Sequence, residues 1–174
     1  MKKSDINPMP EYFERYIKTV DDVELPQAFD LSIRQLEILD KSLLASIADK
    51  KYAADKWTIK EIFQHIIDWE RILAQRTLLY ARCEGSTSQS IDENLLAENM
   101  NAERRDFDSL IDELIITRLS TKAMFESFDD RAMLKTGMSW KYEISVLAMG
   151  FTIVGHQKHH VQIVEDKYYP LINL

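Results

Sequence analysis

The sequence predicts an all-α fold, specifically a bundle of four long helices. Its 174 residues include only four glycines and four prolines, too few for the many turns of an all-β protein. Apolar residues recur at three- and four-residue steps over long segments, which is the spacing of amphipathic helices. Four such segments, joined by connectors of very different lengths, favour a four-helix bundle.

The N-terminal part of the chain precedes the first of these helices. We expect residues 1–24 to form an arm, with Pro8 and Pro10 near its start and a short helix within residues 11–20. A periodic segment then predicts one long helix over residues 26–49. Its apolar side is formed by Phe29, Ile33, Leu36, Leu39, Leu43, Leu44 and Ile47.

The second long helix has the clearest start signal. Thr58 stands three residues before Glu61, which is the pattern of a capping box, so we expect a helix over residues 59–83. The small, polar segment 84–90 (EGSTSQS) predicts a loop after it. The apolar side of this helix is formed by Ile62, Ile66, Trp69, Ile72, Leu73 and Leu79.

Two further helices complete the predicted bundle. The third has its strongest apolar periodicity over residues 107–128, and an irregular segment or a single helical turn is expected at 129–142. The fourth is predicted over residues 143–168, because Pro170 lies just beyond its end. Since no repeat or linker interrupts the chain, we expect residues 1–174 to form a single domain.

Composition and charge exclude several classes of function. The formal net charge is −7 and no basic stripe is present, so we do not expect nucleic-acid binding. No apolar run approaches the roughly 20 residues of a membrane span, and the N-terminus lacks the apolar segment of a signal peptide. The one cysteine, Cys83, excludes a disulfide within the chain and fits a reducing compartment. We therefore expect a cytoplasmic protein.

The histidines form the pattern with the strongest chemical content. Three of the four lie within residues 156–160. Because each residue advances about 100° around a helix, His156 and His160 project from the same, largely apolar face. The remaining one, His65, lies on the inward stripe of the second helix. Buried imidazoles without partners are costly, and a divalent metal shared by neutral rings removes that cost.

Three histidine ligands with open positions are typical of catalytic metal sites, and nitrogen ligands fit zinc, nickel, iron(II) or manganese. The glutamate of the H-E-x-x-H motif is missing, since Gln157 follows His156, so a metalloprotease of that type is not supported. Core histidines that only form hydrogen bonds are the alternative that the spacing leaves open.

Two residues beside these histidines have two interpretations each. Asp68 could orient a ligand imidazole, or it could be an exposed partner of Arg71 or Arg76 on the same helix. His159 could act near the metal, or it could be a partly exposed polar residue at the edge of the helix face.

Two segments resemble the DinB/YfiT-like superfamily. Residues 56–82 (KWTIKEIFQHIIDWERILAQRTLLYAR) are similar to its second helix, with a tryptophan, a T-I-K-E start, a histidine and an E-R step. Residues 153–169 (IVGHQKHHVQIVEDKYY) are similar to its closing G-H-x-x-H-H run, which a tyrosine follows. The resemblance extends over about residues 26–169 and includes the IDENLLAENMNAERR stretch between the two segments.

The resemblance implies a four-helix bundle of up-down-down-up type and a divalent metal bound by His65, His156 and His160. Members of this superfamily include metal-dependent hydrolases and enzymes that transfer low-molecular-weight thiols to electrophiles. A metal-dependent thiol S-transferase or hydrolase is therefore expected, with contacts to substrate from residues 84–91 and 129–142. The alternative is a non-catalytic, metal-binding module associated with stress. Expected partners are a small-molecule substrate, with a low-molecular-weight thiol as a candidate, and a second copy of the chain in a homodimer.

Overall fold

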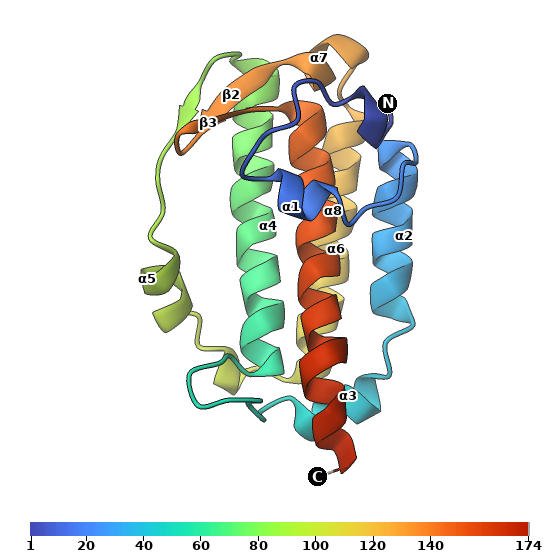
Figure 1. The fold of residues 1–174 in the computed structure, drawn as a ribbon, viewed down its shortest axis with the longest axis vertical. Coiled ribbons are helices and arrows are strands. Elements are labelled where there is room, and N and C mark those ends of the chain that lie inside the picture. The colour runs from blue at the N-terminus through green and yellow to red at the C-terminus, as the bar shows by residue number, and fades with distance from the viewer. Residues whose placement is uncertain (174) are drawn as a thin grey trace.

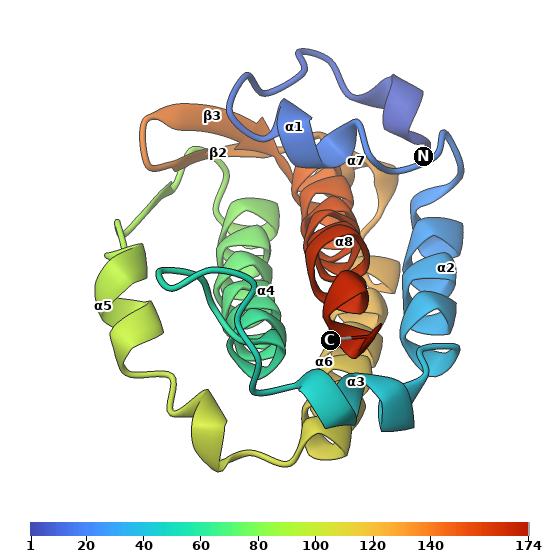
Figure 2. The ribbon, with the colours of Figure 1, turned by 60° about the horizontal axis from the view of Figure 1, so that its bottom comes forward.

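A computed structural model describes residues 1–173, and Leu174 lies outside the described part. Its main body is a four-helix bundle with α2 (Leu25–Glu37), α4 (Ile59–Arg82), α6 (Phe107–Glu126) and α8 (Val146–Ile163). Helices α2 and α8 run in one direction, and α4 and α6 run in the other (Figure 1). This arrangement confirms the predicted up-down-down-up bundle. Helix α2 packs against α6 and α8, and α4 packs against the same two helices, as the tilted view shows (Figure 2).

Shorter elements connect the bundle helices. The long connection from α4 to α6 runs back along one side of the bundle and carries α5, so that both helices can start at the same end (Figure 1). None of the helices within residues 1–173 combines the length and the apolar character that crossing a membrane requires. The connecting helices are η1 (Lys3–Asp5), α1 (Glu14–Ile17), α3 (Lys41–Ile47), α5 (Glu93–Glu98), η2 (Ala102–Arg104), α7 (Asp130–Leu134), η3 (Val164–Tyr168) and η4 (Tyr169–Asn173).

A small sheet covers one end of the bundle. Strand β1 (Thr87–Ser88) pairs in parallel with β2 (Thr136–Ser139), and β2 pairs antiparallel with β3 (Tyr142–Ser145). The sequence analysis missed this sheet, because its strands are too short for a two-residue period to stand out. As a consequence α8 begins at Val146 and not at residue 143, and the Ser145 side chain accepts a hydrogen bond from Ala148 N at its start.

The second bundle helix begins as predicted. Thr58 Oγ1 accepts a hydrogen bond from Glu61 N at 3.1 Å, and Glu61 Oε2 accepts one from Thr58 N at 2.6 Å. This reciprocal pair satisfies backbone donors that an open helix end leaves without partners. The helix ends at Arg82, one residue before the predicted end.

The prediction of one helix over residues 26–49 is wrong. The chain leaves the helical path after Glu37 and begins α3 at Lys41, where the Asp40 side chain accepts a hydrogen bond from Leu43 N at 2.9 Å. Aspartate at this position favours a new helix start because its side chain satisfies a free backbone N–H. Apolar residues stay in phase across the break, which is why the periodicity did not reveal it.

The N-terminal segment packs on α8. Ile6, Phe13 and Ile17 are buried, and Leu25 N donates a hydrogen bond to Met1 O at 3.0 Å. Contact with α8 depends on Gly155, because a Cβ built at this position would lie 2.1 Å from Tyr16 O. Helix α1 of this segment lies across α8 (Figure 1), and its Tyr16 ring contacts the rings of His156 and His159.

The apolar core consists of two clusters with polar side chains between them. One cluster includes Leu73 of α4 and Phe151 of α8, and the other includes Ile66 of α4 and Val161 of α8. The buried polar residues of the four helices include Ser32, His65, Glu70, Arg118, His156 and Gln157. We refer to these six residues as the polar layer.

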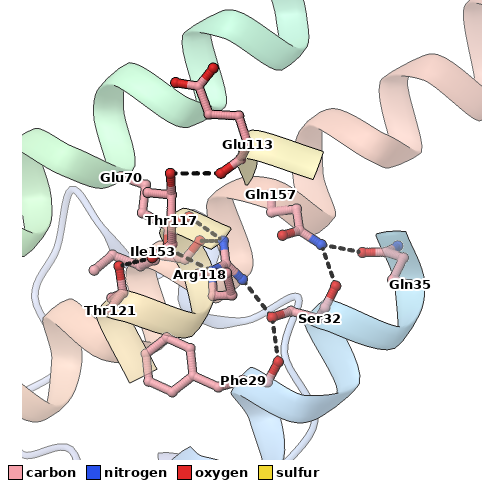
Figure 3. A network of polar contacts seen from close by, with 10 residues as sticks. All are labelled: Phe29, Ser32, Gln35, Glu70, Glu113, Thr117, Arg118, Thr121, Ile153 and Gln157. Atoms are coloured by element: carbon pink, nitrogen blue, oxygen red, sulfur yellow. Dashed lines mark hydrogen bonds and ion pairs between the residues drawn. The ribbon is translucent and has the colours of Figure 1, made fainter. Parts of the chain in front are cut away.

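An ion pair crosses the bundle in this layer. Arg118 of α6 donates from Nε and Nη2 to the two carboxylate oxygens of Glu70 at 2.9 and 2.8 Å, and from Nη1 to Ser32 Oγ at 2.5 Å (Figure 3). The Arg118 side chain is fully buried. Gln157 of α8 donates to Ser32 O at 2.8 Å, so side chains of all four bundle helices meet here.

This ion pair gives a prediction about stability. Arg118→Met should lower the free energy of unfolding by about 3–5 kcal/mol, because it leaves the Glu70 carboxylate buried without its partner. The double variant Arg118→Met/Glu70→Leu should lose less than the single variant. Urea denaturation followed by circular dichroism measures both. A single-variant loss below about 1 kcal/mol, the range of an exposed pair, would contradict this assignment.

Candidate metal centre

The structure brings His65, His156 and His160 together. His65 Nε2 lies 3.2 Å from His156 Nε2, and His160 Nε2 lies 3.1 Å from the same atom. His65 is on α4, and the other two are one turn apart on α8, which packs against α4. In the described chain these residues form a group whose potential ligand atoms all lie within 4.8 Å of one another.

Burial keeps these rings neutral. Desolvation lowers the pKa of His65 to about 4. Desolvation, followed by the nearby His65 and His159, lowers the pKa of His160 to about 3. The pKa of His156 is also lowered well below its ordinary value, first by burial and then by His160. A neutral imidazole has a free lone pair on one nitrogen, which is the form that binds a metal.

The spacing of these nitrogens fits a shared cation. Two nitrogens at about 2.0–2.1 Å from one zinc in tetrahedral geometry lie about 3.3 Å apart. The two observed Nε2–Nε2 distances, 3.2 and 3.1 Å, are close to this value. Hydrogen bonds alone satisfy the cluster less well, because a neutral ring whose proton is on Nε2 has no lone pair there.

Aromatic rings enclose two of the three histidines. The Trp57 ring packs on His65 with 4.7 Å between ring centroids, and the Tyr16 ring packs edge-on against His156 at 5.1 Å. Tyr16 comes from α1, so the N-terminal segment forms one wall of the centre. These contacts orient the rings and exclude water from much of the site.

The two neighbouring candidates lie outside this triad. Asp68 accepts a hydrogen bond from Gln64 Nε2 at 2.9 Å, whereas Arg71 pairs with Glu113 at 2.7 Å. Burial raises the pKa of the Asp68 carboxyl, and the Gln64 hydrogen bond opposes that shift. His159 is exposed, and its ring lies 5.5 Å from that of Tyr16 and 5.1 Å from that of His160.

A pocket reaches the triad from the side of the sheet. Its volume is about 200 Å³, and it is lined by Thr152 and by one histidine of the triad, His156. Ser90 and Trp140 also line it, so both connectors that the sequence suggested for substrate contacts contribute to its wall. A second, more open hollow of about 250 Å³ is lined by His160.

Sequence analysis gave no role in the site to three other residues of this region, and it considered Arg76 only as an exposed partner of Asp68, whereas Arg76 is buried and bonds to Ser139 and Gln89. Tyr16 covers His156, Arg76 lines the pocket, and Arg118 forms the buried ion pair. The two arginines had a detectable signal: each is a charged residue on the apolar stripe of its helix. Arg76 follows Leu73 at three residues, and Arg118 follows Leu114 at four. Tyr16 had no such signal, because its contact with His156 depends on how the N-terminal segment crosses α8.

Comparisons with known proteins identify relatives of this chain. The family model of the DinB superfamily matches residues 28–164. Among solved structures, the chain is similar to YfiT from Bacillus subtilis, described as a probable metal-dependent hydrolase with an unusual four-helix bundle topology. The TM-score is 0.70 at 17% sequence identity, and the match covers 96% of this chain and 90% of that chain. No curated protein sequence matches.

The depressed histidine pKa values predict how the metal-free protein responds to acid. Unfolded histidine has a pKa of about 6.5, so between about pH 6.5 and 4 the unfolded chain binds a proton at His65 that the folded chain does not. The free energy of unfolding should therefore fall as the pH falls, by up to about 1.4 kcal/mol per pH unit for this residue. His65→Gln should reduce the slope by that amount.

Urea denaturation in the presence of a chelator, at pH values from 7 to 4.5, measures this slope. The comparison uses slopes, so a change in overall stability of the variant does not affect it. Identical slopes for the wild type and His65→Gln would show that the His65 ring is not held neutral by burial.

Proposed function

The chain belongs to the DinB superfamily, and on this basis we propose that it is an enzyme that uses a divalent cation to act on small molecules. His65, His156 and His160 are the proposed ligands of the cation. The observation that carries this proposal is the approach of three Nε2 atoms from two buried imidazoles and one half-buried imidazole, of which His156 lines a pocket. Three protein ligands leave positions for substrate, as in catalytic rather than structural sites.

Of the reactions open to such a site, we favour transfer of a thiol to an electrophilic carbon. When bound, a divalent cation supplies Lewis-acid chemistry that favours the deprotonated form of a thiol or water. Hydrolysis also needs a base to accept the proton of water, and two carboxylates on the helix that carries His65 already have hydrogen-bond partners. Glu70 is paired with Arg118, and Asp68 accepts from Gln64. A thiol has a pKa of about 8.5, so beside a bound cation it would lose its proton at neutral pH without such a base.

The residues of the chain have the following roles in this reaction. The sulfur of the thiol forms a C–S bond with the electrophile, the leaving group departs with its electron pair, and the thiol proton goes to solvent. Neutral imidazoles hold the cation, Tyr16 and Trp57 exclude water from the rings, and the pocket positions the electrophile against His156.

Hydrolysis is the second candidate, and the description of YfiT as a probable metal-dependent hydrolase favours it. A non-catalytic, metal-binding role is the third. The three roles differ in what the protein consumes: thiol and electrophile together, an ester or amide with water, or nothing.

Metal binding gives the first prediction. The full chain should bind one zinc, nickel, iron(II) or manganese ion, measured by equilibrium dialysis and elemental analysis. His160→Ala should weaken binding by at least about 100-fold, because it removes a ligand directly. His159→Ala is the matched control, since it removes the adjacent, exposed imidazole, and it should bind the metal like the wild type. Equal affinity in His160→Ala would contradict the ligand set.

Activity gives the second prediction. The metal-loaded protein should consume a chloro-aromatic electrophile in the presence of one thiol from a panel that includes glutathione and bacillithiol. Chelation and His160→Ala should both abolish this consumption. Turnover of esters without a thiol would indicate the hydrolase instead. Unfolding on chelation, with no substrate consumed in any assay, would favour the non-catalytic role.

A further inference from the structure

Arg76 is a buried cation without an anionic partner. Its residue is only 6% exposed, yet it forms no ion pair with any carboxylate in residues 1–173. Nη1 donates to Ser139 Oγ at 3.2 Å and Nη2 donates to Gln89 O at 2.9 Å. A guanidinium has five N–H donors, so further donors are left over. Desolvation lowers the pKa of Arg76, in agreement with the missing partner.

The other buried arginine, Arg118, has the anionic partner that Arg76 lacks. Arg118 has two hydrogen bonds to the Glu70 carboxylate, which compensate the cost of removing its charge from water. Arg76 lies on α4, as Glu70 does, and has only neutral acceptors. Since a buried charge normally has a partner of opposite charge, the structure around Arg76 lacks an anion.

The free donors of Arg76 adjoin the pocket of the metal centre. Arg76 lines this pocket together with Trp69, whose ring centroid lies 5.7 Å from the Arg76 guanidinium carbon. The indole Nε1 of Trp69 is itself buried without a hydrogen-bond partner. Two unrelated side chains of one pocket wall thus have donors without acceptors, and an anion with two oxygens could satisfy both.

The rest of the pocket wall is mostly apolar. Phe13, Leu73 and Trp140 line it, and its volume of about 200 Å³ lies below the usual range of about 300–1,000 Å³ for ligand pockets. Trp140 has a φ of 58°, because it lies in the two-residue turn that joins β2 to β3. The one carboxylate of the wall, Glu93, is exposed and belongs to the peripheral α5.

We propose that this pocket binds a small carboxylic acid with an aromatic or aliphatic body, and that Arg76 pairs with its carboxylate. The inference rests on the proposed function, because it assigns a substrate class to the same centre. A bound acid lies beside His156, which lines the same pocket, so its reactive part faces the triad. Arg76 is thus a residue that selects substrates, and Trp69 supplies a second donor.

The test compares 3-phenylpropanoate with its uncharged amide, 3-phenylpropanamide. Isothermal titration calorimetry measures both ligands on the full chain, as purified and after chelation of metal. The wild type should bind the acid at least about 10-fold more tightly than the amide, which is the contribution of one charged hydrogen bond. Arg76→Gln should remove this preference and leave the affinity for the amide unchanged.

Two variants serve as controls. Arg76→Lys keeps the positive charge in the pocket wall and should retain part of the preference for the acid. This result would show that the loss of preference in Arg76→Gln comes from the missing charge and not from misfolding. Arg82→Gln removes an exposed arginine of the same helix, and it should bind both ligands as the wild type does. Circular dichroism spectra of all variants establish that they are folded.

Each outcome supports or overturns the inference. A preference for the acid that Arg76→Gln removes, and that chelation leaves in place, supports the pairing with Arg76. A preference that survives in Arg76→Gln but disappears on chelation places the carboxylate on the cation and overturns it, as does equal binding of acid and amide. If the protein prefers the acid through Arg76 but consumes no electrophile or ester in the activity assays, the proposed reaction is refuted and the role of Arg76 stands.

Discussion

The ion pair between Arg118 and Glu70 is the interaction on which the centre depends. It joins α6 to α4 at one level of the bundle, and the bond from Arg118 to Ser32 adds α2 to the same level. Gln157 of α8 contacts Ser32, and it is the residue next to His156. We infer that these directional contacts fix the register of the helices, since apolar side chains alone tolerate small shifts along a bundle axis.

The register of α4 and α8 along the bundle axis explains why the three imidazoles lie together. His65 lies five residues before Glu70 on α4, and His156 directly precedes Gln157 on α8. When the ion pair and the Gln157 contact form, both histidine-bearing segments are at the same height. The apolar clusters on either side of the polar layer keep the rings dry and neutral, and the N-terminal segment covers α8 through Gly155 and Tyr16. Access remains through the pocket, where Arg76 is held without an anion.

Sequence reasoning was most successful where the signal is local. The capping box at Thr58 and the inward positions of His65 and His156 follow from patterns within single segments, and the direction of the helices followed from the family resemblance. It failed at residues 38–40, where apolar spacing continues through a break, and at residues 136–145, where a short hairpin lacks a clear period. The partner of Arg118 is 48 residues away, so only the folded chain shows that this charge is buried and paired.

The central claim is that three imidazoles from two helices hold one cation. Anomalous diffraction from crystals grown with zinc, recorded at the zinc absorption edge, measures this directly. The account predicts a single strong peak in the polar layer at about 2.0–2.1 Å from Nε2 of His65, His156 and His160. A crystal in which zinc scatters only from other sites, with these three nitrogens in contact only with one another, would contradict it.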